Sequence, residues 1–269
     1  FGDGARTYSG TEPELVNRTK RRPLFAGMPR QARFIVPDIA LHVIQRGHNR
    51  NACFKDDTDR MVYLATVADL LRNGGCALHA YCLMTNHVHM LLTPATPHAC
   101  STLMRNLGQR YAQYFNRRHD RTGSLWEGRY RSCLVDSASY VLACYRYVER
   151  NPVRAGMVPS AAAYRWSSYQ GNAGCAVNRM LTPHAEYLAL GNDEHPRWPA
   201  YQQMLDAADE PGFLTAIRDA TNGGLALVDD ALKAKLQTDT GRLLEHKKPG
   251  PPPASEAANL DLLSAELGF

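Results

Sequence analysis

Hydrophobic and polar positions follow two different periods along the first two thirds of the chain. Short apolar or alternating runs predict strands at about 39–46, 76–84, 87–93 and 130–135. Apolar side chains recur every three to four positions in 56–71, 101–118 and 137–150, which predicts helices. Asp56 or Asp57 can cap the first helix, and Asp136 or Ser137 the last. Only two residues separate the second and third strands, so we expect an antiparallel hairpin.

The order is strand, helix, strand, strand, helix, strand, helix. It predicts an α+β fold with a ferredoxin-like antiparallel sheet and helices on one face. We assign this domain to residues 28–171. Residues 1–27 show no periodicity and predict a flexible leader, which need not be native because Met28 is a plausible start. Residues 172–245 predict a mostly helical extension, and 246–269 a basic, proline-rich segment and tail that can serve as a linker, a DNA contact or a regulatory element.

Composition places the chain among ordinary globular proteins. It has 269 residues, 44% hydrophobic, with a net charge of +5, and no apolar run reaches the ~18 residues of a membrane span. The seven cysteines are scattered without a Cys-x-x-Cys pair, which favours reduced thiols in the cytoplasm. We therefore expect a cytoplasmic protein without a membrane partner. The mildly basic charge is weak evidence for nucleic-acid binding unless it is clustered.

Two pairs of polar residues carry the candidate chemistry. His87 and His89 alternate with Val88 on a strand, so they share a face and can share a metal ion. An isolated His-x-His is more often two ordinary strand histidines. On the third helix, Tyr147 and Asn151 are four residues apart and can contribute to one site. Tyr145 belongs to the apolar stripe of that helix, so we expect it to be packed in the core.

The residues around these pairs resemble one protein family. Met-Thr-Asn-His-Val-His, ending at His89, resembles the HUH motif of single-tyrosine HUH nucleases. Arg-Tyr-Val-Glu-Arg-Asn-Pro-Val-Arg-Ala-Gly at 146–156 resembles the tyrosine helix of transposases associated with repetitive extragenic palindromes (REP). Further stretches that fit are MPRQAR at 28–33, HVIQRGHNR at 42–50, GSLWEGRY at 123–130 and WSSY at 166–169. The similarity covers roughly 28–171 and, more loosely, the helical extension up to the Pro-Gly-Pro segment.

The resemblance implies metal-dependent nicking and strand transfer on single-stranded DNA at palindromic hairpin repeats. Tyr147 would be the nucleophile that forms a 5′-phosphotyrosine. His87, His89 and Asn151 would hold Mg²⁺ or Mn²⁺, although Asn151 precedes a proline and can instead belong to the end of the helix. The resemblance also implies a bacterial cytoplasmic protein that binds REP-like hairpins, and the short connection before the last helix favours a monomer that uses its own tyrosine.

Arginines and aromatic residues gather between 105 and 131, where seven arginines accompany two acidic residues. A solvated helix face is the ordinary explanation, but a groove that contacts phosphates and stacks bases also fits. The residues expected to contact DNA are Arg46, Asn49, Arg50, Arg105, Arg110, Arg117, Arg118, Trp126, Arg129 and Arg131. His79 and His119 are not expected to be catalytic. The alternatives are a domesticated, non-transposing DNA-binding protein and an RNA-binding module, which would lack the usual aromatic signature.

Overall fold

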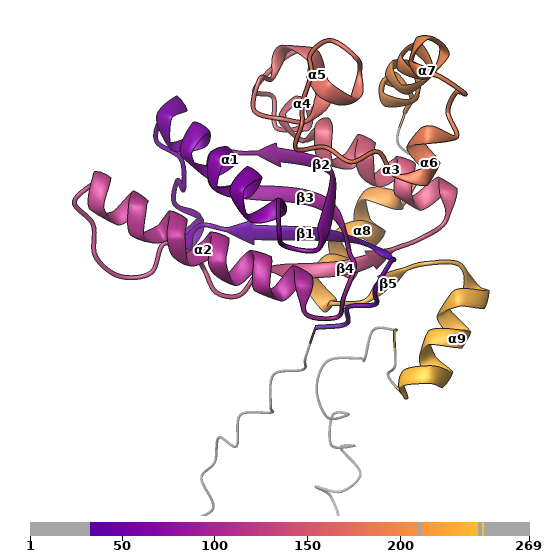
Figure 1. Cartoon of the computed structure of the whole chain (residues 1–269), viewed down its shortest axis with the longest axis horizontal. Helices are drawn as coiled ribbons and strands as arrows, with labels where there is room; N and C mark the ends of the chain where they lie inside the picture. The colour runs from indigo at the N-terminus through magenta and orange to yellow at the C-terminus, as the bar shows by residue number, and fades with distance from the viewer. Residues whose placement is uncertain (1–32, 209–210, 242–243, 245–269) are drawn as a thin grey trace, which may run out of the picture. The chain divides into compact units, whose positions relative to one another are not determined.

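The computed structural model describes residues 33–208, 211–241 and 244, so the expected leader at 1–27 and the segment at 246–269 lie outside the described residues. The first elements are β1 (Ala40–Arg46), α1 (Asp57–Leu71), β2 (Cys76–Leu83), β3 (His87–Pro94), α2 (Ala99–Arg118), β4 (Arg131–Val135) and α3 (Ala138–Glu149) (Figure 1). This is the predicted order, with ends that differ by one or two residues. The side chain of Asp56 caps α1, and that of Ser137 caps α3.

The sheet has the strand order β2-β3-β1-β4-β5, in which the first four strands form antiparallel pairs. This order confirms the ferredoxin-like arrangement. The short fifth strand, β5 (Ala226–Leu227), pairs in parallel with β4, so the sheet is mixed. The two central strands, β1 and β3, are in register at Ile44 and His89, and at Arg46 and His87. The histidine strand therefore lies in the middle of the sheet.

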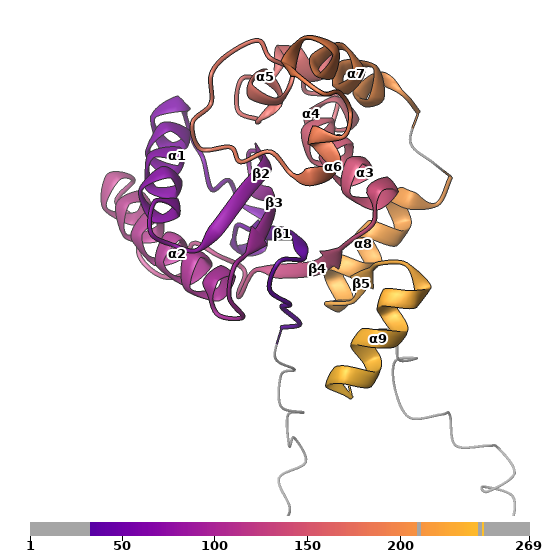
Figure 2. The ribbon, with the colours of Figure 1, turned by 45° about the vertical axis from the view of Figure 1, so that its right-hand side comes forward.

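Helices cover both faces of this sheet, whereas we expected them on one face. Helices α1 and α2 lie on one side, as the ferredoxin-like order predicts, and α3 and α8 (Phe213–Gly223) lie on the other (Figure 2). The physical reason is that the central strands are buried on both faces of the sheet. Leu41, His42 and Val43 follow one another on β1, and each is at most 1% exposed. A strand buried on two faces needs two covering layers.

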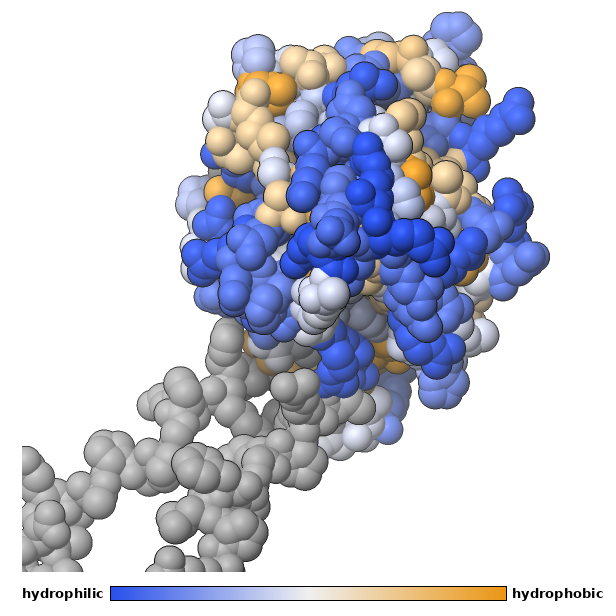
Figure 3. Space-filling view, turned by 90° about the vertical axis from the view of Figure 1, so that its left-hand side faces the viewer, coloured by the Kyte–Doolittle hydropathy of each residue, from blue (hydrophilic) through white to orange (hydrophobic). Residues whose placement is uncertain are grey.

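Aromatic side chains fill the space between the sheet and helices α1 and α2. Tyr63 and Tyr111 meet edge to face with ring centroids 4.9 Å apart, and Phe54 and Trp126 complete the cluster. The hydroxyl of Tyr111 donates to the carbonyl oxygen of Cys53 at 2.7 Å. This face is a closed core. Hydrophilic residues cover most of the molecular surface seen in Figure 3, and hydrophobic residues are scattered between them.

The segment after residue 171 contains several helices and packs on the same sheet. Its elements, after α4 (Asn151–Arg154) and α5 (Tyr169–Asn172), are α6 (Ala185–Leu188), α7 (Glu194–Asp206), α8, β5 and α9 (Asp230–Thr240). Helix α8 packs against β4, and β5 extends the sheet. The division at residue 171 stays a prediction. Among the described helices, none is long and apolar enough to cross a membrane.

Candidate active site

The histidine pair of β3 faces helix α3. The ring centroids of His87 and His89 lie 4.9 Å apart, as the alternation of a strand predicts. His89 is 2% exposed, whereas His87 is partly exposed. The side-chain oxygen of Asn86 lies 2.6 Å from Nδ1 of His87 and accepts its proton. The other ring nitrogen of His87, Nε2, then carries a lone pair.

A directed chain of hydrogen bonds fixes the second imidazole. The hydroxyl of Thr221 donates to the carbonyl of Ile217 at 2.7 Å, so it accepts from Nδ1 of His42 at 2.8 Å. Nε2 of His42 is then an acceptor for Nδ1–H of His89 at 2.9 Å. This order leaves the lone pair of His89 on Nε2. Both strand histidines therefore keep Nε2 available and have Nδ1 occupied, which is the arrangement of metal-binding histidines with a second hydrogen-bond partner.

Burial keeps these imidazoles neutral, which is the form that binds metals. It lowers the pKa of His42 to about 3 and that of His87 to about 4, and it lowers the pKa of His89 well below its usual value. Arg46 adds to the effect at His87 through its positive charge. Protonation would therefore compete with metal binding only in acid solution.

Asn151 supplies the third polar group beside the histidines. Its Nδ2 lies 2.9 Å from Nε2 of His89, and rotating the amide by half a turn would place Oδ1 there instead. Among the described residues, no three His, Cys, Asp or Glu side chains gather in a metal-binding arrangement. A metal at this place would therefore use two imidazoles and an amide, and Asn151 fits that requirement. Arg150 lies between α3 and α4, so Asn151 begins a new short helix.

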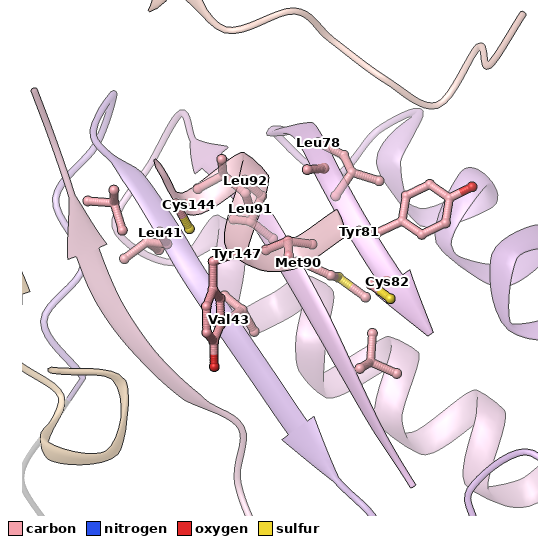
Figure 4. Packing of buried hydrophobic residues seen from close by; sticks show 14 of the residues in the cluster. Leu41, Val43, Leu78, Tyr81, Cys82, Met90, Leu91, Leu92, Cys144 and Tyr147 are labelled. Carbon is pink, nitrogen blue, oxygen red and sulfur yellow. The ribbon is translucent and has the colours of Figure 1, made fainter. Parts of the chain in front are cut away.

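Tyr147 lies over the two buried histidines. Its ring meets those of His89 and His42 edge to face, with centroid distances of 5.5 and 5.4 Å. Figure 4 shows its hydroxyl pointing away from Cys144 and Leu91. The side chain is 6% exposed. Tyr145, in contrast, is fully buried, and its hydroxyl accepts a hydrogen bond from the backbone of His184, as expected for a core residue.

Two opposing effects act on the hydroxyl of Tyr147. Burial raises its pKa above the usual value, and a hydrogen-bonding contact with Arg218 and the charges of Arg154 and Arg218 lower it. Arg154 also donates to the carbonyl oxygen of Tyr147, and its guanidinium carbon lies 4.6 Å from the centre of the tyrosine ring. The site thus surrounds a weak nucleophile with positive charge.

A cleft of about 360 Å³ joins these groups. The four residues that the sequence predicts for catalysis and metal binding all line it. The other lining residues are His42, Ile44, Arg46, Arg154, Ala155, Arg218, Thr221 and Asn222. A smaller hollow next to the cleft shares Arg46 and Asn222 with it and adds Arg129 and Arg131. Arg131 donates to Oδ1 of Asn222 at 2.6 Å.

The remaining expected DNA contacts are not brought together. Asn49 and Arg50 are exposed on a turn after β1. The arginines of α2, which are Arg105, Arg110, Arg117 and Arg118, lie on the helix that covers the opposite face. Trp126 is 8% exposed and donates to the carbonyl oxygen of Gly108, so it is packed rather than presented to a base. The stretch from 105 to 131 therefore does not form one groove.

Sequence reasoning missed seven residues of the cleft, among them His42, Arg154, Arg218 and Thr221. His42 carries a detectable signal, because it alternates with Ile44 and Arg46 on a predicted strand, but the partner strand is not evident from the sequence. Arg154 is in the tyrosine-helix motif. Arg218 and Thr221 lie in the extension, where the sequence gives no reason to connect them with β1 or α3.

The comparisons with known proteins agree with this site. Residues 35–151, which carry both histidines, Tyr147 and Asn151, match the family model described as "Transposase IS200 like". No curated protein sequence matches the chain. Several solved structures are similar at low sequence identity, among them the following three.

The first is a REP-associated tyrosine transposase bound to a REP hairpin, with 14% identity, a TM-score of 0.48, and coverage of 59% of this chain and 93% of that chain. The second is a protein from Deinococcus radiodurans described as a transposase, with 19% identity, a TM-score of 0.32, and coverage of 42% and 91%. The third is the tRNA(His) guanylyltransferase of Saccharomyces cerevisiae, with 11% identity, a TM-score of 0.32, and coverage of 68% and 86%. The family match thus spans residues 35–151, the part of the chain that holds the candidate site.

Proposed function

We propose that this protein nicks single-stranded DNA at hairpin repeats and transfers the strand through a 5′-phosphotyrosine on Tyr147. The observation that carries the proposal is the meeting of Tyr147 with the His87–His89 pair in one cleft of one chain. The hydroxyl of Tyr145, a core tyrosine, bonds to a single backbone group. Tyr147 instead lies between two imidazoles and two guanidinium groups, which suit a phosphodiester.

The covalent step exchanges one ester bond for another. The Oη of Tyr147 attacks the phosphorus and loses its proton to solvent, while the bond from phosphorus to the 3′-oxygen breaks. The released 3′-oxygen takes a proton from solvent. The phosphotyrosine keeps the energy of the ester, so a free 3′-hydroxyl can reverse the reaction and join strands without a nucleotide cofactor.

The metal requirement follows from the donor set. Nε2 of His87, Nε2 of His89 and the side-chain oxygen of Asn151 would hold Mg²⁺ or Mn²⁺ with water completing the shell. When bound there, such an ion would supply Lewis-acid polarisation of the scissile phosphate. The protein's own residues position these ligands, because Asn86 and His42 each hold one imidazole by Nδ1.

The substrate is single-stranded hairpin DNA resembling REP palindromes. The support for a hairpin is the sequence resemblance of 28–171, and the support for DNA is the group of arginines around the cleft. Arg46, Arg129 and Arg131 line the small hollow next to the cleft, together with Glu127, and the arginines can hold the phosphates next to the cleaved one. Because one chain supplies the tyrosine, the histidines and the amide, we propose that it acts as a monomer. From the sequence resemblance we also propose that it acts in the bacterial cytoplasm.

The test is cleavage of a labelled single-stranded hairpin with Mg²⁺ or Mn²⁺. A 3′-labelled substrate should become attached to the protein, whereas a 5′-labelled one should release a fragment with a 3′-hydroxyl. Tyr147→Phe should abolish the adduct. Tyr145→Phe, two positions earlier on the same helix, should retain it. His87→Ala and His89→Ala should lower the cleavage rate by about 10³-fold or more.

The rival function is hairpin binding without cleavage by a domesticated protein. Tight binding of the hairpin with no adduct in either metal would favour it. An adduct that survives in Tyr147→Phe would contradict the choice of nucleophile.

A further inference from the structure

Helix α8 lies outside residues 35–151, which match the family model, and it places Arg218 in the cleft that holds Tyr147. We propose that Arg218 is a catalytic residue that contacts the Tyr147 hydroxyl and holds the negative charge of the attacking oxygen and the scissile phosphate. The proposal rests on the proposed function and names a residue that neither the sequence motifs nor the family match contains, because the match ends at residue 151.

Buried contacts fix the position of α8. Ile217 is fully buried, and Phe213 and Ala220 are at most 5% exposed, so one side of the helix belongs to the core. The ring of Phe213 also contacts the ring of Tyr140 on α3, with centroids 6.5 Å apart. Gly212 and Gly224 flank the helix with left-handed backbone angles, which glycine adopts without strain. The helix is therefore held firmly against the sheet.

Polar contacts on the neighbouring side of α8 orient it toward the cleft. Thr221 accepts from Nδ1 of His42, and Asn222 accepts from Arg131. Arg218 precedes these residues by three and four positions, so it lies on the same side of the helix. It lines the cleft together with both of them and Tyr147. Thr221 thus joins the extension to β1, and Asn222 joins it to β4. Arg218 brings the extension to the cleft that holds the nucleophile.

The two arginines at Tyr147 have different geometries. Arg154 stacks over the tyrosine ring and donates to its backbone carbonyl. Arg218 lines the same cleft as Tyr147, and it lowers the pKa of the tyrosine hydroxyl, the group that reacts. A guanidinium stays charged at all physiological pH values and can donate two parallel hydrogen bonds to a phosphate. Arg218 is exposed to the cleft, so it can meet a DNA strand without prior rearrangement.

In the covalent step Arg218 takes no proton. It neutralises charge while the Oη–phosphorus bond forms and the phosphorus–O3′ bond breaks, with the proton exchanges to solvent described above. Donors fixed at a point of developing charge typically contribute about 10²–10³ to a rate constant. The helix would thereby make the extension part of the active site.

The experiment compares Arg218→Ala and Arg218→Lys with Arg165→Ala in single-turnover cleavage. Arg165 is an exposed arginine that pairs with Asp57 on the α1 side, so its replacement changes the net charge equally. We expect Arg218→Ala to cleave about 10²-fold more slowly, Arg218→Lys to recover part of the rate, and Arg165→Ala to match the parent protein. Added ethylguanidinium should restore part of the rate of Arg218→Ala only.

Hairpin binding in EDTA separates catalysis from affinity. The dissociation constant of Arg218→Ala should stay near that of the parent. Cleavage at the parent rate would overturn the proposal. So would a rate loss explained wholly by weaker binding, because Arg218 would then be a backbone contact and not a catalytic residue.

A metal-free measurement keeps this inference distinct from the proposed function. In nuclear magnetic resonance spectra, the Nε–H signal of Arg218, assigned with Arg218→Lys, should shift in Tyr147→Phe and stay in place in Tyr145→Phe. An unchanged signal in Tyr147→Phe would show that Arg218 does not contact the Tyr147 hydroxyl. If the signal shifts but the parent protein forms no adduct, the proposed function fails while the contact stands.

Discussion

The two faces of the sheet use similar residue types for different purposes. On the α1–α2 face, Arg118 pairs with Asp56 at 2.7 Å and also with Asp59, and Arg110 pairs with Asp69 at 2.7 Å. On the α3–α8 face, Arg46 and Arg129 form no ion pair with any carboxylate among the described residues. The count of arginines is therefore a poor guide to positive potential. Local pairing with acids decides which face can attract a phosphate.

Histidines and aromatic residues show the same contrast. His119, next to the arginines of α2, pairs with Asp59 at 2.9 Å. His42 and His89 are instead neutral, nearly parallel to each other and joined by a single directed chain of hydrogen bonds. Tyr111 is enclosed by other rings, whereas Tyr147 meets imidazoles and an open cleft. We infer that the first face stabilises the fold and the second carries the chemistry.

The largest expected effect concerns the closed face. Tyr111→Ala should lower the free energy of unfolding by about 3–5 kcal/mol, because it removes a fully buried ring. Tyr111→Phe should cost about 1 kcal/mol, because it leaves the carbonyl of Cys53 without its donor. Denaturant titration measures both values. Tyr111→Phe should cleave DNA like the parent, and a loss of cleavage with unchanged stability would break the division between the faces.

The second effect concerns a buried acid at the end of α3, the helix that carries Tyr147. Glu149 accepts from Ser168, Asn172 and Tyr201, and burial raises its pKa from 4.5 to about 7. A raised pKa in the folded state means that stability is full below pH 4.5 and falls as the pH rises toward 7. Glu149→Gln removes this loss and can keep all three contacts. Its advantage over the parent should grow with pH and reach about 3 kcal/mol above pH 7.

Thermal or denaturant unfolding of Glu149→Gln across this pH range is the measurement. Tyr201→Phe serves as the comparison, because it removes one donor and keeps the carboxylate. If Glu149→Gln were equally destabilised at pH 5 and pH 8, the carboxylate would be held by its partners and not penalised by burial.

The third effect tests the hydrogen-bond chain behind the metal ligands. His42→Leu removes the acceptor for Nδ1–H of His89 and should weaken Mn²⁺ binding by about 10–100-fold. Thr221→Val acts one bond further away and should weaken it less. Titration of the metal-free protein with Mn²⁺, followed by electron paramagnetic resonance, measures the affinity. Equal Mn²⁺ affinity in His42→Leu and the parent would show that His42 does not position the ligand.

The smallest effect compares one arginine from each face. Arg46→Ala should weaken hairpin binding and reduce the slope of log K against log salt by about 1, because it removes one phosphate contact. Arg117→Ala, on the exposed side of α2, should have a smaller effect on both quantities. Binding titrations at several salt concentrations provide the test. A larger loss in Arg117→Ala would place the DNA on the α1–α2 face.

The sequence predicted the local elements well, because their signals are local. Alternation located β1 and β3, and the caps at Asp56 and Ser137 fixed the helix starts. The His87–His89 pair and the Tyr147–Asn151 spacing predicted which side chains converge, because the members of each pair are close in the chain. His87 and His89 lie on one strand, and Tyr147 and Asn151 lie on either side of the junction between α3 and α4.

Long-range contacts were beyond the sequence. Thr221 lies 179 residues after His42, and no periodicity connects them. The covering of both sheet faces depends on where α3 returns after β4, which is a property of packing. The arginine stretch misled for a related reason. Its charges are close in the chain, but α2 takes them to one face while Arg129 and Arg131 go to the other.

The central claim is that the α3–α8 face carries the nucleophile, and peptide mapping of the protein–DNA adduct tests it most directly. Trypsin cuts after Arg146 and Arg150, so Tyr147 is isolated in residues 147–150, whereas Tyr140 and Tyr145 fall in 132–146. After nuclease digestion of the adduct, mass spectrometry should find the remaining nucleotide on 147–150. A nucleotide on 132–146, or on a tyrosine of the α1–α2 face, would contradict the account.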